Sequence, residues 1–358
     1  MDGLTTPVSL AHKVAFLSGA SAYGLRDEQV ECRETHMSWV FLVGGDVYKL
    51  KKPVRFAYLD FSSVGKRYRH CLAELTLNRR LAADVYKKII PMTCSAGKLA
   101  IGGRGEIVDW LVVMRRLDDS QTLERALLER RLTTRQLDPL IEVLARFYRR
   151  AGPVALSSDT FLAQWRRGLR ENEIVLLDRR LNLAAPMVRR LHRIQRRFLD
   201  QRSALLVERC RHIVDGHGDL RPEHIWLGPP VRIIDCLEFN QRLREVDPLD
   251  EIAFLSIECA RLGGARYGDH IERRLCTALP DVASDQLFAF YRCYRATLRA
   301  RLSIAHLLEP FPRTPAKWQR QTRAYFALAT ANADRLEHMM NRSLATGGAD
   351  SRTCSSHA

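Results

Sequence analysis

The sequence predicts an α+β fold with two lobes, a small N-terminal lobe built on an antiparallel sheet and a larger, mainly helical C-terminal lobe. Short apolar runs at residues 39–43 and 47–51 flank a Gly-Gly-Asp turn, which predicts a β-hairpin. After residue 117 the apolar residues recur mostly at helical spacing. This spacing breaks once, at residues 213–239, where two short apolar runs flank Gly228-Pro229-Pro230 and predict a second hairpin.

The remaining elements follow from periodicity and turn residues. Further strands are expected at residues 88–92 and 107–114, and a helix at residues 64–82. Later helices are expected at residues 123–131, 134–150, 161–181, 186–208, 251–262, 269–279, 284–308 and 315–344. We therefore expect a nucleotide-binding lobe at 1–117, a catalytic and substrate lobe at 118–344 and a disordered tail at 345–358.

Composition excludes several classes of protein. With 46% hydrophobic and 27% charged residues, the chain of 358 residues can bury a core. No apolar run approaches the length of a membrane span, and the N-terminus lacks the pattern of a secretory signal. The nine cysteines form no C-x-x-C pair, so free thiols and a cytoplasmic location are expected.

A net charge of +16 raises the question of nucleic-acid binding. Only nine of the basic residues are lysine, and the arginines are spread along the expected helices instead of forming a basic arm. No stacking motif or helix-turn-helix pattern accompanies them. We therefore do not expect nucleic acid as the main partner. A DNA affinity that falls steeply with salt concentration would show that nucleic acid is the partner instead.

Two carboxylates flank the second hairpin and suggest phosphoryl transfer. Asp219 lies in the tight segment His217-Gly218-Asp219-Leu220, where a carboxylate can orient a hydroxyl and accept its proton. Asp235 ends the run Val231-Arg232-Ile233-Ile234, where a carboxylate can hold Mg²⁺ against nucleotide phosphates. Phosphoryl transfer depends mainly on positioning of the reactants, a metal ion and positive charge, and residues of these types can provide them.

His217-Gly218-Asp219-Leu220 followed by Ile-Asp at 234–235 resembles the catalytic and metal loops of aminoglycoside phosphotransferases and their choline-kinase-like relatives. The resemblance implies a bilobal protein-kinase-like fold that uses ATP and Mg²⁺ to phosphorylate a hydroxyl of a small molecule. It implies that Asp219 is the catalytic base, that Asp235 holds the metal and that Asp250 braces the catalytic loop. Asp250 also suits a helix N-cap, and the two roles can coexist.

The same resemblance assigns the nucleotide-binding residues. Lys49 matches the strand lysine that contacts the α- and β-phosphates, and Glu74 matches its helical partner. Lys51 shares the strand face of Lys49, so Lys49 is favoured by its fit to the motif. His224 stands where the family has a metal-binding Asn, although Mg²⁺ prefers oxygen ligands.

The glycine-rich loop departs further from the family. In place of G-x-G-x-x-G the chain has residues 34–39, where the hydroxyls of Thr35 and Ser38 are the candidate phosphate contacts. Met114 falls at the hinge expected to face the adenine. The chain is most similar to a bacterial group that is sometimes fused to a P-loop ATPase domain, but it contains no G-x-x-x-x-G-K-[ST], so that module is not expected.

Two questions of function stay open from the sequence. Ten arginines between residues 166 and 197 are expected to form a solvated helix face, and any that reach the active site would favour an anionic or neutral acceptor. His224 and the absent glycine loop leave the alternative of a nucleotide-binding pseudokinase or scaffold with weak or no activity.

Overall fold

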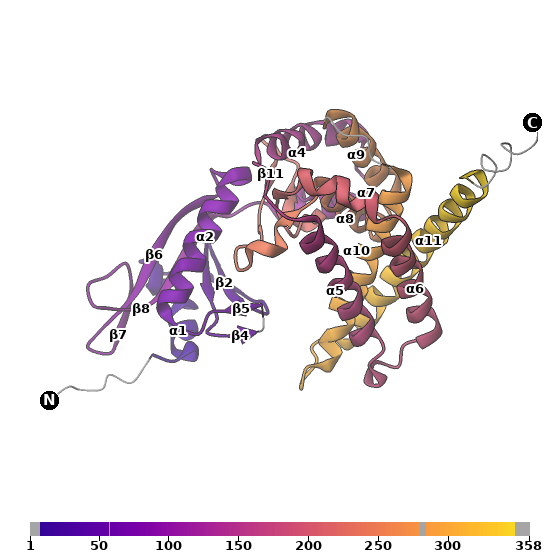
Figure 1. Ribbon diagram of the computed structural model, residues 1–358. Coiled ribbons are helices and arrows are strands. Elements are labelled where there is room, and N and C mark those ends of the chain that lie inside the picture. The colour runs from indigo at the N-terminus through magenta and orange to yellow at the C-terminus, as the bar shows by residue number, and fades with distance from the viewer. Residues whose placement is uncertain (1–7, 57, 280–283, 348–358) are drawn as a thin grey trace, which may run out of the picture. The chain divides into compact units, whose positions relative to one another are not determined.

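The computed structural model describes residues 8–56, 58–279 and 284–347 (Figure 1). These residues pack into two compact units. The first unit comprises Met1–Thr122 and His224–Arg244, and the second comprises Leu123–Glu223 and Glu245–Ala358. The second hairpin therefore packs with the N-terminal sheet, whereas the sequence placed it in the helical lobe. The lobe boundary after residue 117 remains a prediction, and the expected tail at 345–358 lies largely outside the described residues.

The first unit is built on one antiparallel sheet of six strands, in the order β1-β2-β3-β8-β6-β7. The strands are β1 (Glu31–Glu34), β2 (Ser38–Val43), β3 (Asp46–Lys51), β6 (Tyr86–Ser95), β7 (Lys98–Ile101) and β8 (Glu106–Arg115). The predicted hairpin is confirmed: β2 and β3 pair through the turn at Gly44-Gly45, and Gly44 has φ 52°, which favours glycine.

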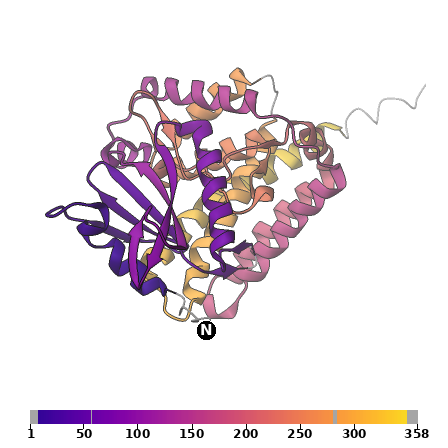
Figure 2. The ribbon, with the colours of Figure 1, turned by 90° about the vertical axis from the view of Figure 1, so that its left-hand side faces the viewer.

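A helix covers each face of this sheet. Helix α2 (Val64–Ala82), which has the predicted bounds, lies across one face of the sheet (Figure 2). It packs through Cys71 and Ala82 on Val112 and Met114 of β8. Helix α1 (Leu10–Leu17) packs its buried Leu17 on the opposite core, which contains Phe41 of β2. Helix α1 is not among the predicted helices, because a helix of eight residues has too few turns for a clear apolar periodicity.

A buried ion cluster joins both helices to the sheet. Asp109 of β8 is 1% exposed, and its carboxylate lies 2.7 Å from Lys13 Nζ of α1. The same carboxylate accepts two hydrogen bonds from Arg67 of α2, at 2.7 Å from Nε and 3.0 Å from Nη2. Because all three groups are buried, each charge depends on the others for compensation.

The hairpin at residues 224–244 completes the first unit. Its strands β10 (Ile225–Trp226) and β11 (Arg232–Ile233) pair antiparallel, as the sequence predicted. A smaller ribbon, β4 (Arg55–Phe56) with β5 (Leu59–Asp60), lies between β3 and α2 in the sequence.

The second unit is helical, apart from one short ribbon. Its helices are α3 (Leu123–Leu128), α4 (Asp138–Arg150), α5 (Ser158–Leu176), α6 (Ala185–Gln201), α7 (Ser203–Arg209), α8 (Pro248–Arg261), α9 (Ala265–Ala278), α10 (Asp285–Ala305) and α11 (Pro315–Gly347). The helix expected at 186–208 is two helices, since the chain leaves helical geometry at Arg202, with φ −129°. Among the residues that the structure describes, no helix is long and apolar enough to cross a membrane.

Helix α8 is the centre of this unit. All its residues from Pro248 to Cys259 are buried, which is typical of a helix enclosed by others. Just before it, β12 (Glu245–Val246) pairs antiparallel with β9 (Val214–Asp215). This ribbon fixes the segment after β9 beside the first turn of α8.

We predict that Asp109→Asn destabilises the first unit strongly. The variant leaves the buried cations Lys13 and Arg67 without their anion, so we expect a loss of about 3–5 kcal/mol in the free energy of unfolding. Urea denaturation measures the loss. As a matched control, Asp46→Asn breaks only the exposed pair with Lys87 and should cost less than about 1 kcal/mol. Equal effects of the two variants would contradict this prediction.

Candidate functional site

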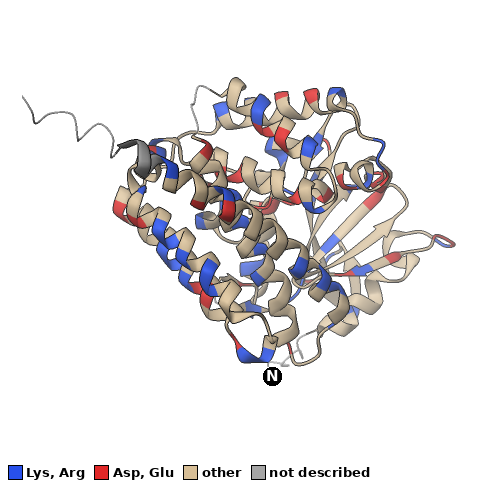
Figure 3. Cartoon of the chain, turned by 90° about the vertical axis from the view of Figure 1, so that its right-hand side faces the viewer, with Lys and Arg blue, Asp and Glu red and all other residues tan. Residues whose placement is uncertain are grey.

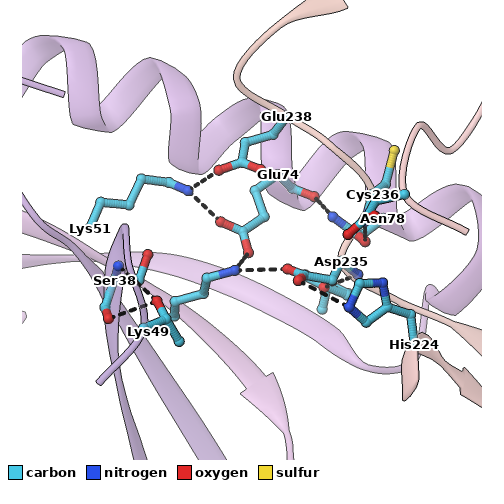
Figure 4. A network of polar contacts seen from close by, with 12 residues as sticks. Ser38, Lys49, Lys51, Glu74, Asn78, His224, Asp235, Cys236 and Glu238 are labelled. Carbon is cyan, nitrogen blue, oxygen red and sulfur yellow. Dashed lines mark hydrogen bonds and ion pairs between the residues drawn. The ribbon is translucent and has the colours of Figure 1, made fainter. Parts of the chain in front are cut away.

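Two lysines of β3 and one glutamate of α2 meet on the face of the sheet that α2 covers (Figure 4). Lys49 Nζ lies 2.7 Å from Glu74 Oε1 and 3.0 Å from Asp235 Oδ1. Lys51 lies on the same face, and its Nζ is 2.6 Å from Glu74 Oε2. The structure thus brings together Lys49, Glu74 and Asp235, and adds Lys51 to them.

The electrostatics of this cluster keep its central groups charged. Burial would raise the pKa of the Glu74 carboxyl, which is 0% exposed, but the nearby charges of Lys49 and Lys51 outweigh burial and lower it. Burial would likewise lower the pKa of Lys49, but Asp235 and Glu74 raise it well above its ordinary value. Each lysine therefore remains a cation at neutral pH.

The loop that carries Asp235 has a fixed backbone. Asp235 has φ 63°, in the left-handed region that few residues other than glycine adopt. Its N–H donates to the hydroxyl of Tyr86 at 3.2 Å, and the next N–H, of Cys236, donates to Asn78 Oδ1 at 2.9 Å. These two bonds hold the backbone on both sides of the metal-ligand candidate.

His224 lies beside Asp235 within the first unit. Its Nε2 is 3.6 Å from Asp235 Oδ2, and its carbonyl accepts the N–H of Ile234 at 3.0 Å. The described residues form no group of three or more His, Cys, Asp or Glu side chains that could hold a metal by itself. Asp235, with 45% of its side chain exposed, suits Mg²⁺, which commonly takes one or two carboxylates and completes its shell with phosphates and water.

The structure gives Thr35 and Ser38 a local role in the turn between β1 and β2. The Thr35 hydroxyl donates to the Ser38 carbonyl at 2.9 Å and accepts the Ser38 N–H at 2.9 Å. The Thr35 N–H also donates to that carbonyl, at 2.8 Å. The turn therefore uses the Thr35 hydroxyl internally, and a phosphate contact from it remains a prediction.

Met114 belongs to the core beneath α2. It is 8% exposed, and it pairs with Val47 of β3 and with Tyr86 of β6. Its strand ends one residue later, at Arg115. An adenine contact at Met114 remains a prediction.

In the second unit, Glu251 of α8 holds the segment predicted to be the catalytic loop. The N–H groups of His217 and Gly218 donate to its carboxylate, at 3.1 Å and 2.5 Å, and Tyr148 donates its hydroxyl at 2.8 Å. Gly218 has φ 85°. A Cβ on Gly216 would lie 3.0 Å from the same carboxylate, so the glycines permit this close approach.

These bonds correct the role assigned to Asp250. Its carboxylate pairs with Arg295 of α10 instead, at 2.7 Å from Nε and 2.5 Å from Nη2. Nor is it the helix N-cap, since Asp247 accepts the N–H of Leu249 at that position. Successive residues of a helix point in different directions, so Glu251 faces the loop while Asp250 faces α10.

Asp219, the predicted base, has an ion pair that the sequence analysis missed. Arg221 Nε and Nη2 lie 3.0 Å and 2.9 Å from Asp219 Oδ2, and Arg221 Nη1 lies 2.6 Å from Glu223 Oε1. Burial would lower the pKa of Arg221, but Asp219 and Glu223 raise it. His217, 1% exposed, accepts the Asp219 N–H at Nδ1 over 3.3 Å. In the sequence, only the short separation of Asp219 and Arg221, with Leu220 between them, could have suggested this ion pair.

The predicted site residues therefore divide between the two compact units. Lys49, Glu74, His224 and Asp235 belong to the first unit, and His217, Asp219 and Asp250 to the second. The division falls between Glu223 and His224, inside the short 3₁₀ turn Pro222–His224.

We predict that Glu74→Gln destabilises the first unit in a pH-dependent way. At pH 7 the variant leaves two buried lysines with one anion fewer, and we expect a loss of about 3–5 kcal/mol. The folded pKa of Glu74 lies below its unfolded value of about 4.3, so its contribution is complete above that pH and is lost as pH falls through the lower folded pKa.

Urea denaturation between pH 7 and pH 3.5 tests this prediction. The difference between wild type and Glu74→Gln should stay constant down to about pH 5 and shrink below about pH 4. Glu31→Gln, on the exposed strand β1, serves as the control and should give a much smaller difference. A difference that does not change across this range would contradict the prediction.

Comparison with known proteins places the fold. No protein-family model matches the chain. Uncharacterized proteins of Mycobacterium tuberculosis and Mycobacterium bovis are 33% identical over 344 residues, which is 91% of this chain. The chain spans 64% of the length of these relatives.

Solved structures of small-molecule kinases have a similar fold. A choline/ethanolamine kinase family protein from Mesorhizobium loti has a TM-score of 0.54 at 16% identity, covering 90% of this chain and 94% of its own. Choline kinase from Cryptosporidium parvum has 0.53 at 9%, covering 91% and 95%. A spectinomycin phosphotransferase solved with ADP and spectinomycin has 0.51 at 14%, covering 91% and 99%. The chain has the protein-kinase-like α+β fold that aminoglycoside phosphotransferases and choline kinases share.

Proposed function

We propose that this protein is a phosphotransferase that moves the γ-phosphate of ATP to a hydroxyl of a small molecule. The observation that carries the proposal is the position of Lys49 Nζ, within 3.0 Å of both Glu74 and Asp235. A nucleotide with its metal needs a cation to contact its phosphates and a carboxylate to bind the metal. Lys49, held between buried Glu74 and half-exposed Asp235, supplies the cation, and Asp235 supplies the carboxylate. The similar fold of the spectinomycin enzyme, which was solved with ADP, supports nucleotide binding.

Each residue has a definite task in this proposal. Lys49, oriented by Glu74, would bind the nucleotide phosphates, and Asp235, with His224 beside it, would hold the magnesium. Bound Mg²⁺ supplies positive charge that offsets the charge on the transferred phosphoryl group. Asp219 orients the acceptor hydroxyl and accepts its proton. Glu251 keeps the backbone of the catalytic loop in place, and Arg221 supplies positive charge beside the base.

The nature of the acceptor is not set by the arginine-rich helices. Of the ten arginines between residues 166 and 197, eight are exposed and two are half-buried. Along α6 the sequence has five arginines and a single acidic residue, Asp200, and Figure 3 shows basic positions recurring along the helices. Their exposure is typical of a solvated face. We propose a small-molecule kinase that need not act on antibiotics. Phosphorylation of kanamycin-type drugs, with no turnover of sugars or anionic alcohols, would contradict the proposal that the acceptor need not be an antibiotic.

A second candidate function is a nucleotide-binding protein without turnover. It is favoured by His224, an imidazole where the family has an amide oxygen, together with the absence of a third protein ligand among the described residues. Both candidates predict a thermal shift with Mg-ATP, so turnover must separate them.

We predict that Asp219→Asn lowers ATP turnover by about 10²–10⁴-fold, because the amide cannot accept the proton of the acceptor. Turnover is measured as ADP release with Mg-ATP, with water or an alcohol as acceptor. Asp200→Asn on the exposed side of α6 removes a carboxylate elsewhere in the same unit and should leave the rate unchanged. Equal rates in wild type and Asp219→Asn would mean that Asp219 is not the base.

We predict that His224→Asn strengthens Mg²⁺ binding beside Asp235. An amide oxygen is a better Mg²⁺ ligand than imidazole, so the half-saturating Mg²⁺ concentration should fall about tenfold. A magnesium titration of ATP turnover, repeated with Mn²⁺ as a metal that accepts imidazole, gives the comparison. An unchanged Mg²⁺ midpoint would show that this side chain does not contact the metal.

A further inference from the structure

The first unit contains a second lysine–glutamate pair beside the one that phosphoryl transfer would use. Lys51 is 0% exposed, and its Nζ lies 2.6 Å from Glu74 Oε2 (Figure 4). The same Nζ donates to Glu238 Oε1, and it lies 5.0 Å from the centre of the Phe61 ring. Lys51 therefore has two carboxylate partners and an aromatic face.

Glu238 belongs to the loop that carries Asp235. The loop is bonded to α2 through Cys236 and Asn78, and Arg244 Nη1 donates to the Leu237 carbonyl at 2.7 Å. Those contacts involve backbone atoms of the loop. Two ion pairs join side chains of the loop to β3: Asp235 with Lys49, and Glu238 with Lys51. Asp235 is the candidate metal ligand, so the pair of Glu238 is the one that remains when Asp235 binds a metal.

The charges of the cluster show why a second lysine is useful. Lys49, Lys51, Glu74 and Glu238 carry two positive and two negative charges, which cancel. Glu74 uses one oxygen for each lysine, so it keeps a cation when Lys49 turns toward a phosphate. Asp235, with 45% of its side chain exposed, then carries the remaining negative charge, available to a divalent cation.

We propose that Lys51 is a positioning residue, whose ion pair with Glu238 fixes the loop of Asp235 to the Lys49–Glu74 pair before nucleotide binds. The functional consequence of this inference, the placement of Asp235 as a metal ligand, rests on the proposed function. The anchoring itself is a property of the first unit and is measurable without turnover.

The anchor has a structural reason to exist. Asp235 is held at φ 63°, a conformation that costs free energy and persists only where the surroundings determine it. Tyr86 accepts the N–H of Asp235, and Asn78 accepts the N–H of the next residue, Cys236. Beyond the Leu237 carbonyl that Arg244 holds, Glu238 supplies a further fixed point, one made by a side chain, which opposes rotation of the loop about Asp235.

Hydrogen exchange in the full chain tests the anchor. Glu238→Gln is the principal variant, because Lys51 keeps Glu74 as a partner, so we expect the fold to be retained. Lys51→Met is the second variant. We expect amides in residues 235–240 to exchange at least about tenfold faster in both variants, with β8 unchanged. Lys52→Met is the matched control, since Lys52 pairs with Glu34 at the end of β1 and should leave this segment unchanged. Wild-type exchange rates in Glu238→Gln would overturn the inference.

Metal binding separates the positioning role from a purely structural one. With ADP and Mn²⁺ as probes, we expect Glu238→Gln to weaken Mn²⁺ binding about tenfold while metal-free ADP binding changes less than about twofold. Equal losses of both would mean a general loss of structure and would overturn the positioning role. Failure of the wild type to bind Mn²⁺ and ADP would contradict the proposed function, and the exchange rates would still decide the anchor.

Discussion

The carboxylate of Glu74 is the constraint on which the first unit depends. It is completely buried and gives one oxygen to each of two lysines on the same strand. Two buried cations and one buried anion would be costly by themselves, and the cost is offset only because Glu238 and Asp235 approach from the second hairpin. The cluster therefore forces a segment distant in sequence to pack on the N-terminal sheet.

Glu251 has the corresponding position in the second unit. One carboxylate accepts two consecutive backbone N–H groups and a tyrosine hydroxyl, which leaves little freedom to the loop at residues 216–218. This arrangement requires Gly216, because a side chain there would meet Val246 and Glu251. The short ribbon of β9 and β12 sets the distance between the loop and α8. A buried central helix thus provides the rigid support that a catalytic loop needs.

The two carboxylate clusters differ in what they hold. Glu74 orients side chains that carry charge, whereas Glu251 orients a backbone. In the proposed reaction the first arrangement serves the phosphates and metal, and the second serves the acceptor hydroxyl. The chain links them through the short turn Pro222–His224, which contains the boundary between the compact units.

Much of the fold could be predicted from the sequence because its signals are local. The hairpin of β2 and β3 follows from alternating apolar residues around Gly44-Gly45, and α2 follows from apolar spacing between clear ends. Short elements such as α1 and β1 were missed, since they depend on the sheet they pack against. The pairing of Lys49 with Glu74 came from the resemblance, and the structure places the two in contact.

By itself, then, the sequence determined the strand order of the first hairpin, the helical second half and the residue types available for phosphoryl transfer. Only the tertiary structure decided which neighbouring residue acts. It selected Glu251 over Asp250 because the rotation of α8 about its axis is set by packing on every side. It gave Lys51 a carboxylate from a distant loop, and it joined Arg221 to Asp219. Periodicity shows which residues share a face, but the partner that meets that face comes from long-range packing.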